Sequence, residues 1–180
     1  LNGIDYDVMH RDFDATNWQS VKQGHKSSLL AKLGLVDDNR PLFSYISRLD
    51  PNQKGIDIMY DCIEPVVKEY GTFVLLGTGD PTWESKLRDL AVILNAKYGN
   101  HTSINIQFDT KLADEIYLAS DFFFVPSRFE PCGLTQMMAM FYGALPIVRD
   151  TGGLKDSVID SVNGFKFKTY SSEELLTTIG

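Results

Sequence analysis

The chain reads Leu42-Phe-Ser-Tyr-Ile46, then a segment of helical length from Gly55 to Tyr70, then Thr72-Phe-Val-Leu-Leu76. Each short apolar run has the length and the residue types of a buried strand. A strand, a helix and a second strand in this order form a unit in which the two strands lie parallel. This stretch therefore predicts an α/β fold whose sheet is covered by helices on both faces.

The same alternation continues toward the end of the chain. Further strands are expected at 103–108, 122–125, 145–148 and 165–167. Further helices are expected at 20–34, 81–97, 111–119, 133–142, 153–159 and from 171 or 172 onward. We therefore predict a Rossmann-like doubly wound parallel sheet over residues 19–180, preceded by a connecting arm at 1–18.

The composition narrows the classes of function. Of 180 residues, 43% are hydrophobic and 23% charged, as in an ordinary soluble globular domain. The net charge of −7 argues against general nucleic-acid binding, which needs a basic face. No apolar run approaches the roughly 20 residues that span a bilayer, so no membrane partner is expected. Cys62 and Cys132 have no metal-type spacing with histidine, so neither a metal nor another cofactor is expected.

In parallel sheets, ligands bind beyond the carboxyl ends of the strands, so the loops after the strands are the candidate sites. The loop after the first strand carries two cations, Arg48 and Lys54. Guanidinium and ammonium groups together neutralise a diphosphate leaving group without a metal. A solvated basic loop without function is an equally good interpretation of these two residues alone.

The loops after the second and third strands carry weaker signals. Gly77 and Gly79 let the backbone approach a ligand, although an ordinary turn with Asp80 as helix N-cap explains much of that loop. Phe108 ends the third expected strand, where a nucleotide base can stack on its ring. Packing in the core is the commoner fate of such an aromatic side chain.

The loop after the fourth strand lies in Pro126-Ser-Arg-Phe-Glu-Pro-Cys-Gly-Leu-Thr-Gln-Met137. The amides of Gly133, Leu134 and Thr135, at an expected helix start, suit a phosphate, and Glu130 suits a neutral, hydroxyl-rich group. The combination indicates a nucleotide-sugar. As alternatives, Glu130 complements the helix dipole, and Cys132 is a small packing residue because no histidine is placed to activate it.

The stretches 126–136 and Arg149-Asp-Thr-Gly-Gly-Leu-Lys-Asp156 resemble the bacterial glycogen synthases and plant starch synthases. These are retaining glycosyltransferases of the two-domain GT-B architecture, and the resemblance covers essentially the whole chain. It implies that the chain is the C-terminal, donor-nucleotide-binding domain, without the N-terminal acceptor domain and the closing C-terminal helices. It also implies a cytoplasmic location if the protein is bacterial and a plastid location if it comes from a plant.

The resemblance assigns roles residue by residue. Arg48 and Lys54 take the place of the cations on the distal phosphate, and Glu130 that of the acid contacting the donor glucose. Phe108 takes the place of the aromatic on adenine. The remaining positions in the family's donor site are Gly77, Gly79, Cys132, Gly133, Leu134 and Thr135. Two departures stand out: Lys54 follows Arg48 after six steps instead of five, and Asp150 replaces a common arginine.

The activity that the resemblance implies is transfer of glucose from ADP-glucose to the non-reducing end of an α-1,4-glucan, with retention. ADP-glucose or ADP would bind this chain, and the glucan would bind the missing N-terminal domain. No second carboxylate is evident for a double displacement, which favours a same-face substitution assisted by the leaving phosphate. A non-catalytic nucleotide- or glucan-binding module and a GT-B transferase with another donor are the alternatives.

Overall fold

The computed structural model describes residues 16–180 of the chain. The expected connecting arm at 1–18 therefore lies almost wholly outside the described residues. Trp18, which we placed in that arm, is instead the first residue of the helix α2 (Trp18–Lys32).

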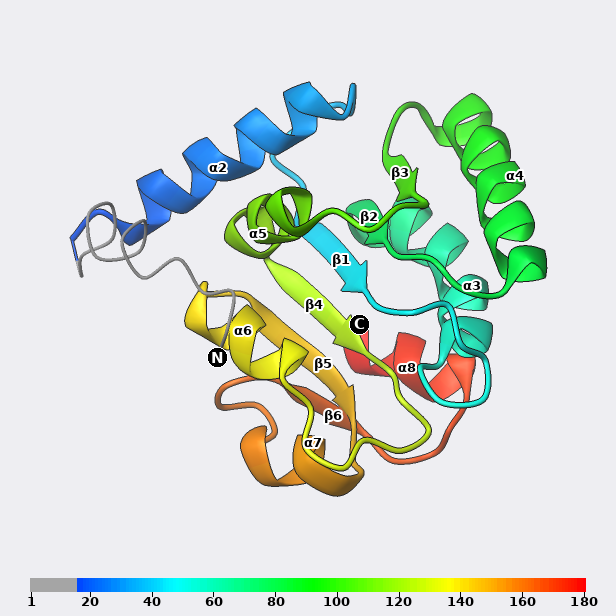
Figure 1. Cartoon of the computed structure of the whole chain (residues 1–180). Helices are drawn as coiled ribbons and strands as arrows, with labels where there is room; N and C mark the ends of the chain where they lie inside the picture. The colour runs from blue at the N-terminus through cyan, green and yellow to red at the C-terminus, as the bar shows by residue number, and fades with distance from the viewer. Residues whose placement is uncertain (1–15) are drawn as a thin grey trace.

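A sheet of six parallel strands forms the centre of the molecule, in the order β3-β2-β1-β4-β5-β6 (Figure 1). The strands are β1 (Leu42–Ile46), β2 (Thr72–Leu76), β3 (Thr102–Asn105), β4 (Phe122–Val125), β5 (Leu145–Arg149) and β6 (Phe165–Phe167). The first three strands build outward from β1 in one direction and the last three build outward in the other. This order confirms the prediction of a doubly wound α/β fold.

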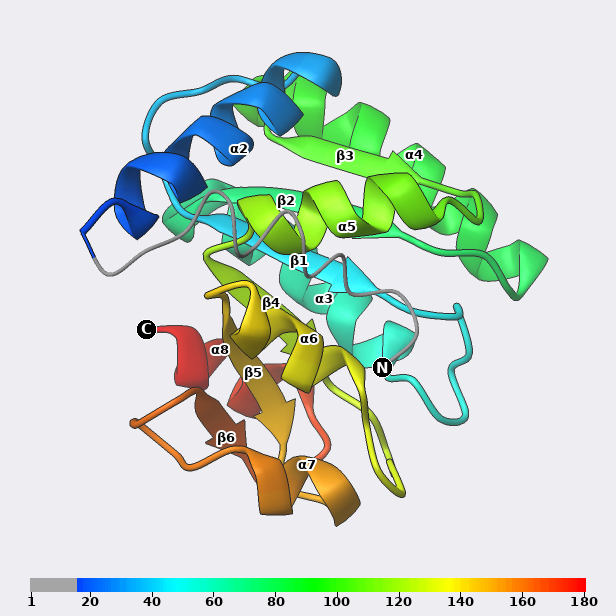
Figure 2. The same ribbon diagram turned by 60° about the vertical axis from the view of Figure 1, so that its left-hand side comes forward.

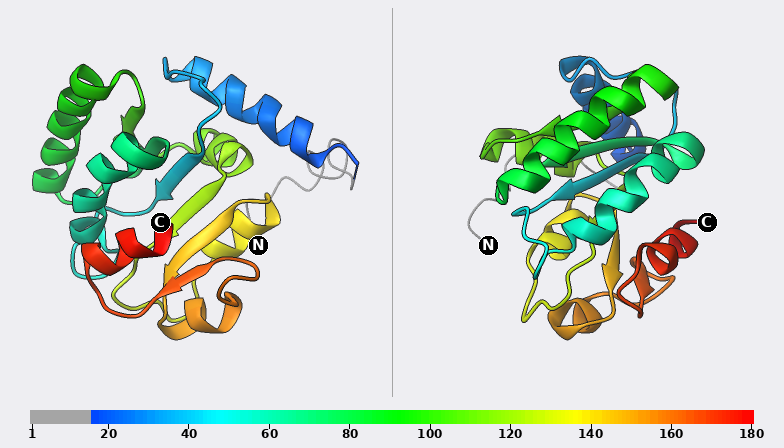
Figure 3. Two further views of the ribbon diagram at one scale, coloured as in Figure 1. Left: turned by 180° about the vertical axis from the view of Figure 1, so that it is seen from behind. Right: turned by 90° about the vertical axis from the view of Figure 1, so that its right-hand side faces the viewer.

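Helices cover both faces of the sheet, as the views from behind and from the side show (Figure 3). They are α2, α3 (Ile56–Pro65), η1 (Val66–Tyr70), α4 (Pro81–Tyr98), α5 (Thr110–Ala119), α6 (Thr135–Phe141), α7 (Gly152–Ser157) and α8 (Ser172–Ile179). Alternate residues of each strand point to opposite faces, which assigns the helices to layers. Phe43, Tyr45 and Phe124 pack with α3, α4 and α8.

The opposite face of the sheet packs against a second layer of helices. Leu42 and Val74 contact residues of α2 and α5, while Phe123 and Val148 contact α5, α6 and α7. Figure 2 shows α5 and α6 in front of the strands, with α2 beside α5. The continuous apolar runs seen in the sequence therefore reflect burial on both faces.

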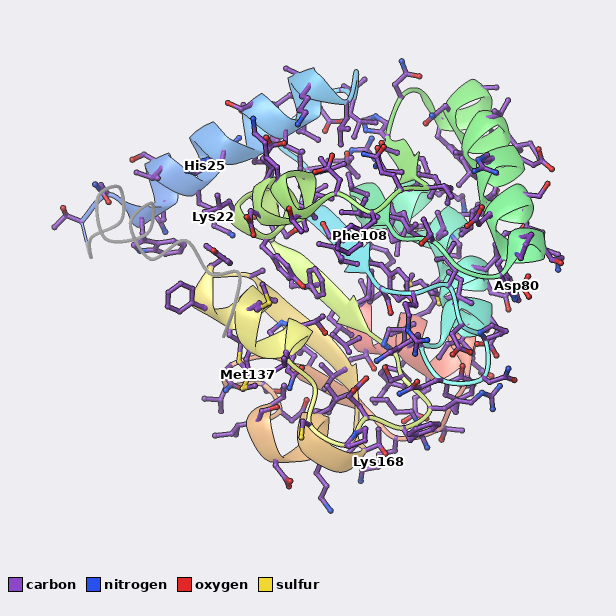
Figure 4. All side chains as sticks on the ribbon, viewed as in Figure 1. Lys22, His25, Asp80, Phe108, Met137 and Lys168 are labelled. Atoms are coloured by element: carbon purple, nitrogen blue, oxygen red, sulfur yellow. The ribbon has the colours of Figure 1, made fainter. Side chains whose placement is uncertain are left out.

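Buried lysines attach α2 to this layer. The Lys22 ammonium donates to the carbonyls of Leu118, in the last turn of α5, and of Tyr142, the residue after α6. Lys26 forms an ion pair with Asp121, with 2.7 Å between nitrogen and oxygen. Burial, which disfavours the charged form, lowers the pKa of Lys22 to about 8. Lys22 is labelled in Figure 4.

Several element boundaries differ from the sequence prediction by one or two residues, and three further differences have a clear physical cause. The strand β3 ends at Asn105 instead of 108, because its neighbour β2 ends at Leu76 and the ladder has no further partner. The expected helix at 133–142 begins only at Thr135, because Gly133 has a φ of +69°, outside the helical region. The helix after β1 changes to a π-helical turn after Pro65, which lacks the N–H that the α-helical bond pattern needs.

Candidate functional site

Two cavities lie beyond the carboxyl end of β1, where the sheet order reverses between β1 and β4. The first, of about 200 Å³, is lined by Arg48, Gly77 and Phe108 among others. The second, of about 210 Å³, is lined by Arg48, Lys54, Ser127, Glu130 and Thr135 among others. Residues 46–48 line both cavities. The reversal of strand order is the place where doubly wound sheets bind nucleotides.

Lys54 and Glu130, which are 76 positions apart, form an ion pair in the second cavity with 2.6 Å between Nζ and Oε2. The Lys54 side chain is 21% exposed and that of Glu130 is 13% exposed. The hydroxyl of Ser127 also donates to Glu130, at 3.4 Å. The carboxylate is therefore held inside the cavity by a cation, and it does not act as a cap of α6, which begins five residues later.

The backbone around Lys54 is fixed from three sides. Its amide donates to the Asp50 carbonyl at 2.8 Å, and its own carbonyl accepts from the buried Tyr45 hydroxyl at 3.1 Å. Gly55 follows with a φ of +78°, and a Cβ there would lie 2.1 Å from the Pro126 carbonyl oxygen. Only glycine permits this close approach of the loops after β1 and β4, which brings Lys54 to Glu130.

Arg48 lies at the rim shared by the two cavities. Its guanidinium donates to Gln53 at 3.1 Å and lies 3.8 Å from the Asp50 carboxylate. The side chain is 68% exposed. Arg48 therefore offers a solvent-accessible positive charge, whereas the charge of Lys54 is held inside the cavity by Glu130.

The glycines of the loop after β2 make room for the loop after β1. A Cβ on Gly77 would lie 1.9 Å from the Ser47 carbonyl oxygen, and one on Gly79 would lie 2.7 Å from that of Leu49. Leu49 is hydrogen-bonded to this loop through both its amide and its carbonyl. These glycines thus allow two loops to cross and so position the backbone beside Arg48.

Phe108 is 89% exposed and lies at the edge of the first cavity. Figure 4 labels it near the carboxyl end of β1, whose following residues line the same cavity. Core packing, the commoner fate that we considered, is therefore excluded for this ring. An exposed aromatic side chain at a cavity rim is available for stacking.

Glu130 and Thr135, the two ends of one loop, line the second cavity. Gly133 is buried, whereas Leu134 is 56% exposed and the Cys132 side chain is exposed. The interpretation of Cys132 as a packing residue is therefore wrong, because its side chain points to solvent. In the part of the chain that the structure describes, the amides of Gly133, Leu134 and Thr135 have no acceptor.

Gly152 and Gly153, the glycine pair after β5, pack directly against the backbone of this loop. A Cβ on Gly152 would lie 2.1 Å from the Glu130 carbonyl oxygen, and one on Gly153 would lie 2.0 Å from that of Cys132. The Gly153 amide donates to the Glu130 carbonyl at 2.9 Å. Asp150, the departure noted in the sequence, faces Lys166 at 3.6 Å, which balances its charge.

Sequence reasoning missed several contributors to the site, namely Tyr45, Ser127, Gln136 and Ser157. Their contacts join segments that are distant along the chain, so local patterns gave no signal for most of them. Gln136 is the exception, since it lies three residues after Gly133, a spacing that lets a side chain reach back to the loop.

Residues 16–180 contain no group of three or more His, Cys, Asp or Glu side chains arranged to hold a metal ion. Within the same residues, no helix combines the length and apolar character needed to cross a bilayer.

The chain is similar to known proteins in both sequence and structure. Residues 30–179 match the family model described as glycosyl transferases group 1. A glycogen synthase of Clostridium botulinum (strain Alaska E43 / Type E3) is 41% identical over 194 aligned positions, and one of Lactococcus lactis subsp. lactis is 43% identical over 193. Each alignment covers 99% of this chain and 39% of the relative.

Among solved structures, the chain is similar to the catalytic domain of starch synthase IV from Arabidopsis thaliana bound to ADP and acarbose. The TM-score is 0.86 at 37% sequence identity, covering 99% of this chain and 39% of that one. The chain thus spans about two fifths of the length of these relatives.

Proposed function

Because this chain belongs to the group 1 glycosyl transferases, we propose that it is the donor-binding half of an enzyme of glucan synthesis. The enzyme transfers glucose from ADP-glucose to the non-reducing end of an α-1,4-glucan with retention. The observation that carries the proposal is the convergence of Arg48, Lys54 and Glu130 on the second cavity, beside the first cavity with Phe108 at its edge.

The two cavities suit the two ends of a nucleotide-sugar. The first offers the exposed Phe108 ring for the base and is lined by Gly77. The second offers the Lys54 ammonium for the distal phosphate and the Glu130 carboxylate for hydroxyls of the sugar. Arg48 lies between them, where it contacts the diphosphate.

The chemistry of the leaving group follows from these charges. Negative charge develops on the diphosphate as its bond to the sugar breaks, and Arg48 and Lys54 stabilise that charge. The Lys54 ammonium has three donors, so it can bind a phosphate oxygen while it keeps its contact with Glu130. Glu130 orients the glucose and does not act as nucleophile.

The glycogen synthases and the ADP-bound starch synthase among the relatives support this donor and this product. The glucan acceptor is assigned to the part of the enzyme that this chain does not include, since the chain spans 39% of its relatives. We expect the isolated chain to bind the donor but not to transfer glucose, because closure of two domains completes such sites.

The proposal is tested by calorimetric titration of this chain with ADP, ADP-glucose and UDP-glucose. ADP and ADP-glucose are expected to bind, and UDP-glucose to bind at least tenfold more weakly. Arg48→Ala should weaken ADP binding, whereas Arg88→Ala, which removes an exposed arginine on α4, serves as the matched control.

Other outcomes identify the alternatives. Equal affinity for UDP-glucose would indicate a transferase with another donor. A chain that binds no nucleotide would not be a donor domain at all, and a structural or glucan-binding role would replace the proposal.

A further inference from the structure

Gln136 lies fully buried, at 0% exposure in the first turn of α6, against the loop whose two ends, Glu130 and Thr135, line the second cavity. Its amide nitrogen lies 2.7 Å from the Gly133 carbonyl oxygen, 3.3 Å from that of Cys132 and 3.0 Å from the Ser157 hydroxyl. The two hydrogens of this amide nitrogen are thus shared among three acceptors. Burying an amide is costly unless it is hydrogen-bonded, and here the bonds go to the loop itself.

These bonds orient the peptide groups of the loop. In a trans peptide, the carbonyl and the following N–H point in opposite directions. The carbonyls of Cys132 and Gly133 point to Gln136, so the amides of Gly133 and Leu134 point away from it. Neither amide has an acceptor within the described residues. Gln136 therefore holds two amides that have no acceptor in the described part of the chain, on the side of the loop opposite to its own side chain.

A second path connects Gln136 to Glu130. The Ser157 hydroxyl, which accepts from Gln136, donates to the Gly153 carbonyl at 2.7 Å. The Gly153 amide in turn donates to the Glu130 carbonyl at 2.9 Å. The loop is thus held directly at Cys132 and Gly133, and through α7 at Glu130.

The position of Gln136 also explains why residue 133 is glycine. A Cβ there would lie 2.5 Å from the Gln136 Oε1 and 2.8 Å from its nitrogen. The Oε1 has no hydrogen-bond partner within the described residues, although it is buried. An apolar side chain would fill this place without leaving an unpaired acceptor, so packing alone does not account for a glutamine.

We propose that Gln136 is a positioning residue for the diphosphate-and-sugar end of the donor. It fixes the loop amides and, through Ser157 and Gly153, the backbone of Glu130. The inference rests on the proposed function, since it concerns how that site is held.

The test compares Gln136→Met, which keeps the length of the side chain and removes its donors, with Ser157→Ala. Each variant of the chain is titrated with AMP, ADP and ADP-glucose. Gln136→Met is expected to weaken ADP-glucose binding about tenfold and AMP binding less than twofold, because AMP mainly occupies the first cavity. Ser157→Ala should show the same selectivity with a smaller loss. Gln23→Met, on the exposed side of α2, is the control.

A second readout needs no nucleotide. Cys62 is buried and burial raises the pKa of its thiol to about 12, so the exposed Cys132 is the thiol that reacts in the folded chain. Release of the loop should change the rate at which Cys132 reacts with a thiol reagent in both variants, because this thiol belongs to the loop that Gln136 and Ser157 hold. If Gln136→Met does not fold, the reactivity of Cys132 in Ser157→Ala still tests the positioning role.

The results separate the two proposals. Equal losses for all three nucleotides, or none, together with unchanged Cys132 reactivity, would overturn the positioning role and leave the donor site standing. A wild-type chain that binds none of the nucleotides would overturn both.

Discussion

Gly55→Ala is expected to destabilise the chain and to disturb the donor site together. Alanine at a φ of +78° costs about 1–2 kcal/mol, because L residues are strained in the left-handed region. The new Cβ would also lie 2.1 Å from the Pro126 oxygen, so that carbonyl must move by roughly 0.9 Å to reach even 3.0 Å. Such overpacking adds about 1–3 kcal/mol.

Gly34→Ala provides a matched control. Gly34 has a φ of +67°, but a Cβ there would meet nothing within 4 Å. This variant should therefore lose only the backbone strain of about 1–2 kcal/mol. The difference between the two variants isolates the contact between the loops after β1 and β4.

Urea unfolding followed by circular dichroism measures both free energies of unfolding, and calorimetry measures ADP binding. Gly55→Ala should be less stable than Gly34→Ala by about 1–3 kcal/mol. It should also bind ADP more weakly, because Pro126 lies four residues before Glu130. Equal stability of the two variants, or normal ADP binding by Gly55→Ala, would refute the reasoning.

Two further changes test other parts of the structure. Phe108→Ala should weaken ADP binding at least fivefold without lowering the melting temperature, since the ring is 89% exposed; a drop in melting temperature alone would show a packing role. Lys22 has a folded pKa of about 8 against an ordinary 10.5, so the unfolded chain holds more protons between these values. Its contribution to stability should therefore rise by about 2–3 kcal/mol from pH 7 to pH 10. Urea unfolding of wild type and of Lys22→Met between pH 7 and pH 10 measures this contribution. If the difference in their free energies of unfolding does not change with pH, the burial of the ammonium is contradicted.

Local sequence patterns predicted most of the fold. The apolar runs identified all six strands, and Asp80 caps α4 through the amides of Thr82 and Trp83, as its position before Pro81 indicated. The helix and strand boundaries that were predicted wrongly depend on residues that are close in space but distant in the sequence. Residues 106–108 alternate like a strand, yet β2 no longer runs beside them.

The candidate site was only partly accessible to sequence reasoning. Arg48, Lys54 and Glu130 were identified because they are charged residues in the loops that follow buried strands. The ion pair between Lys54 and Glu130 could not be derived, because it depends on β4 lying next to β1. The local contact of Gln136 with Gly133 could have been anticipated from their spacing, whereas its bond to Ser157 could not, because Ser157 belongs to another helix.

The most direct test of the donor site is the amide NMR spectrum of the ¹⁵N-labelled chain as ADP is added. Shifts are expected in the loops around both cavities, at residues 47–55, at Gly77 and Gly79, and at Gly133 to Thr135. Little change is expected on α4. Shifts confined to other surfaces, with the loop from Glu130 to Thr135 unaffected, would contradict the assignment of this cleft as the donor site.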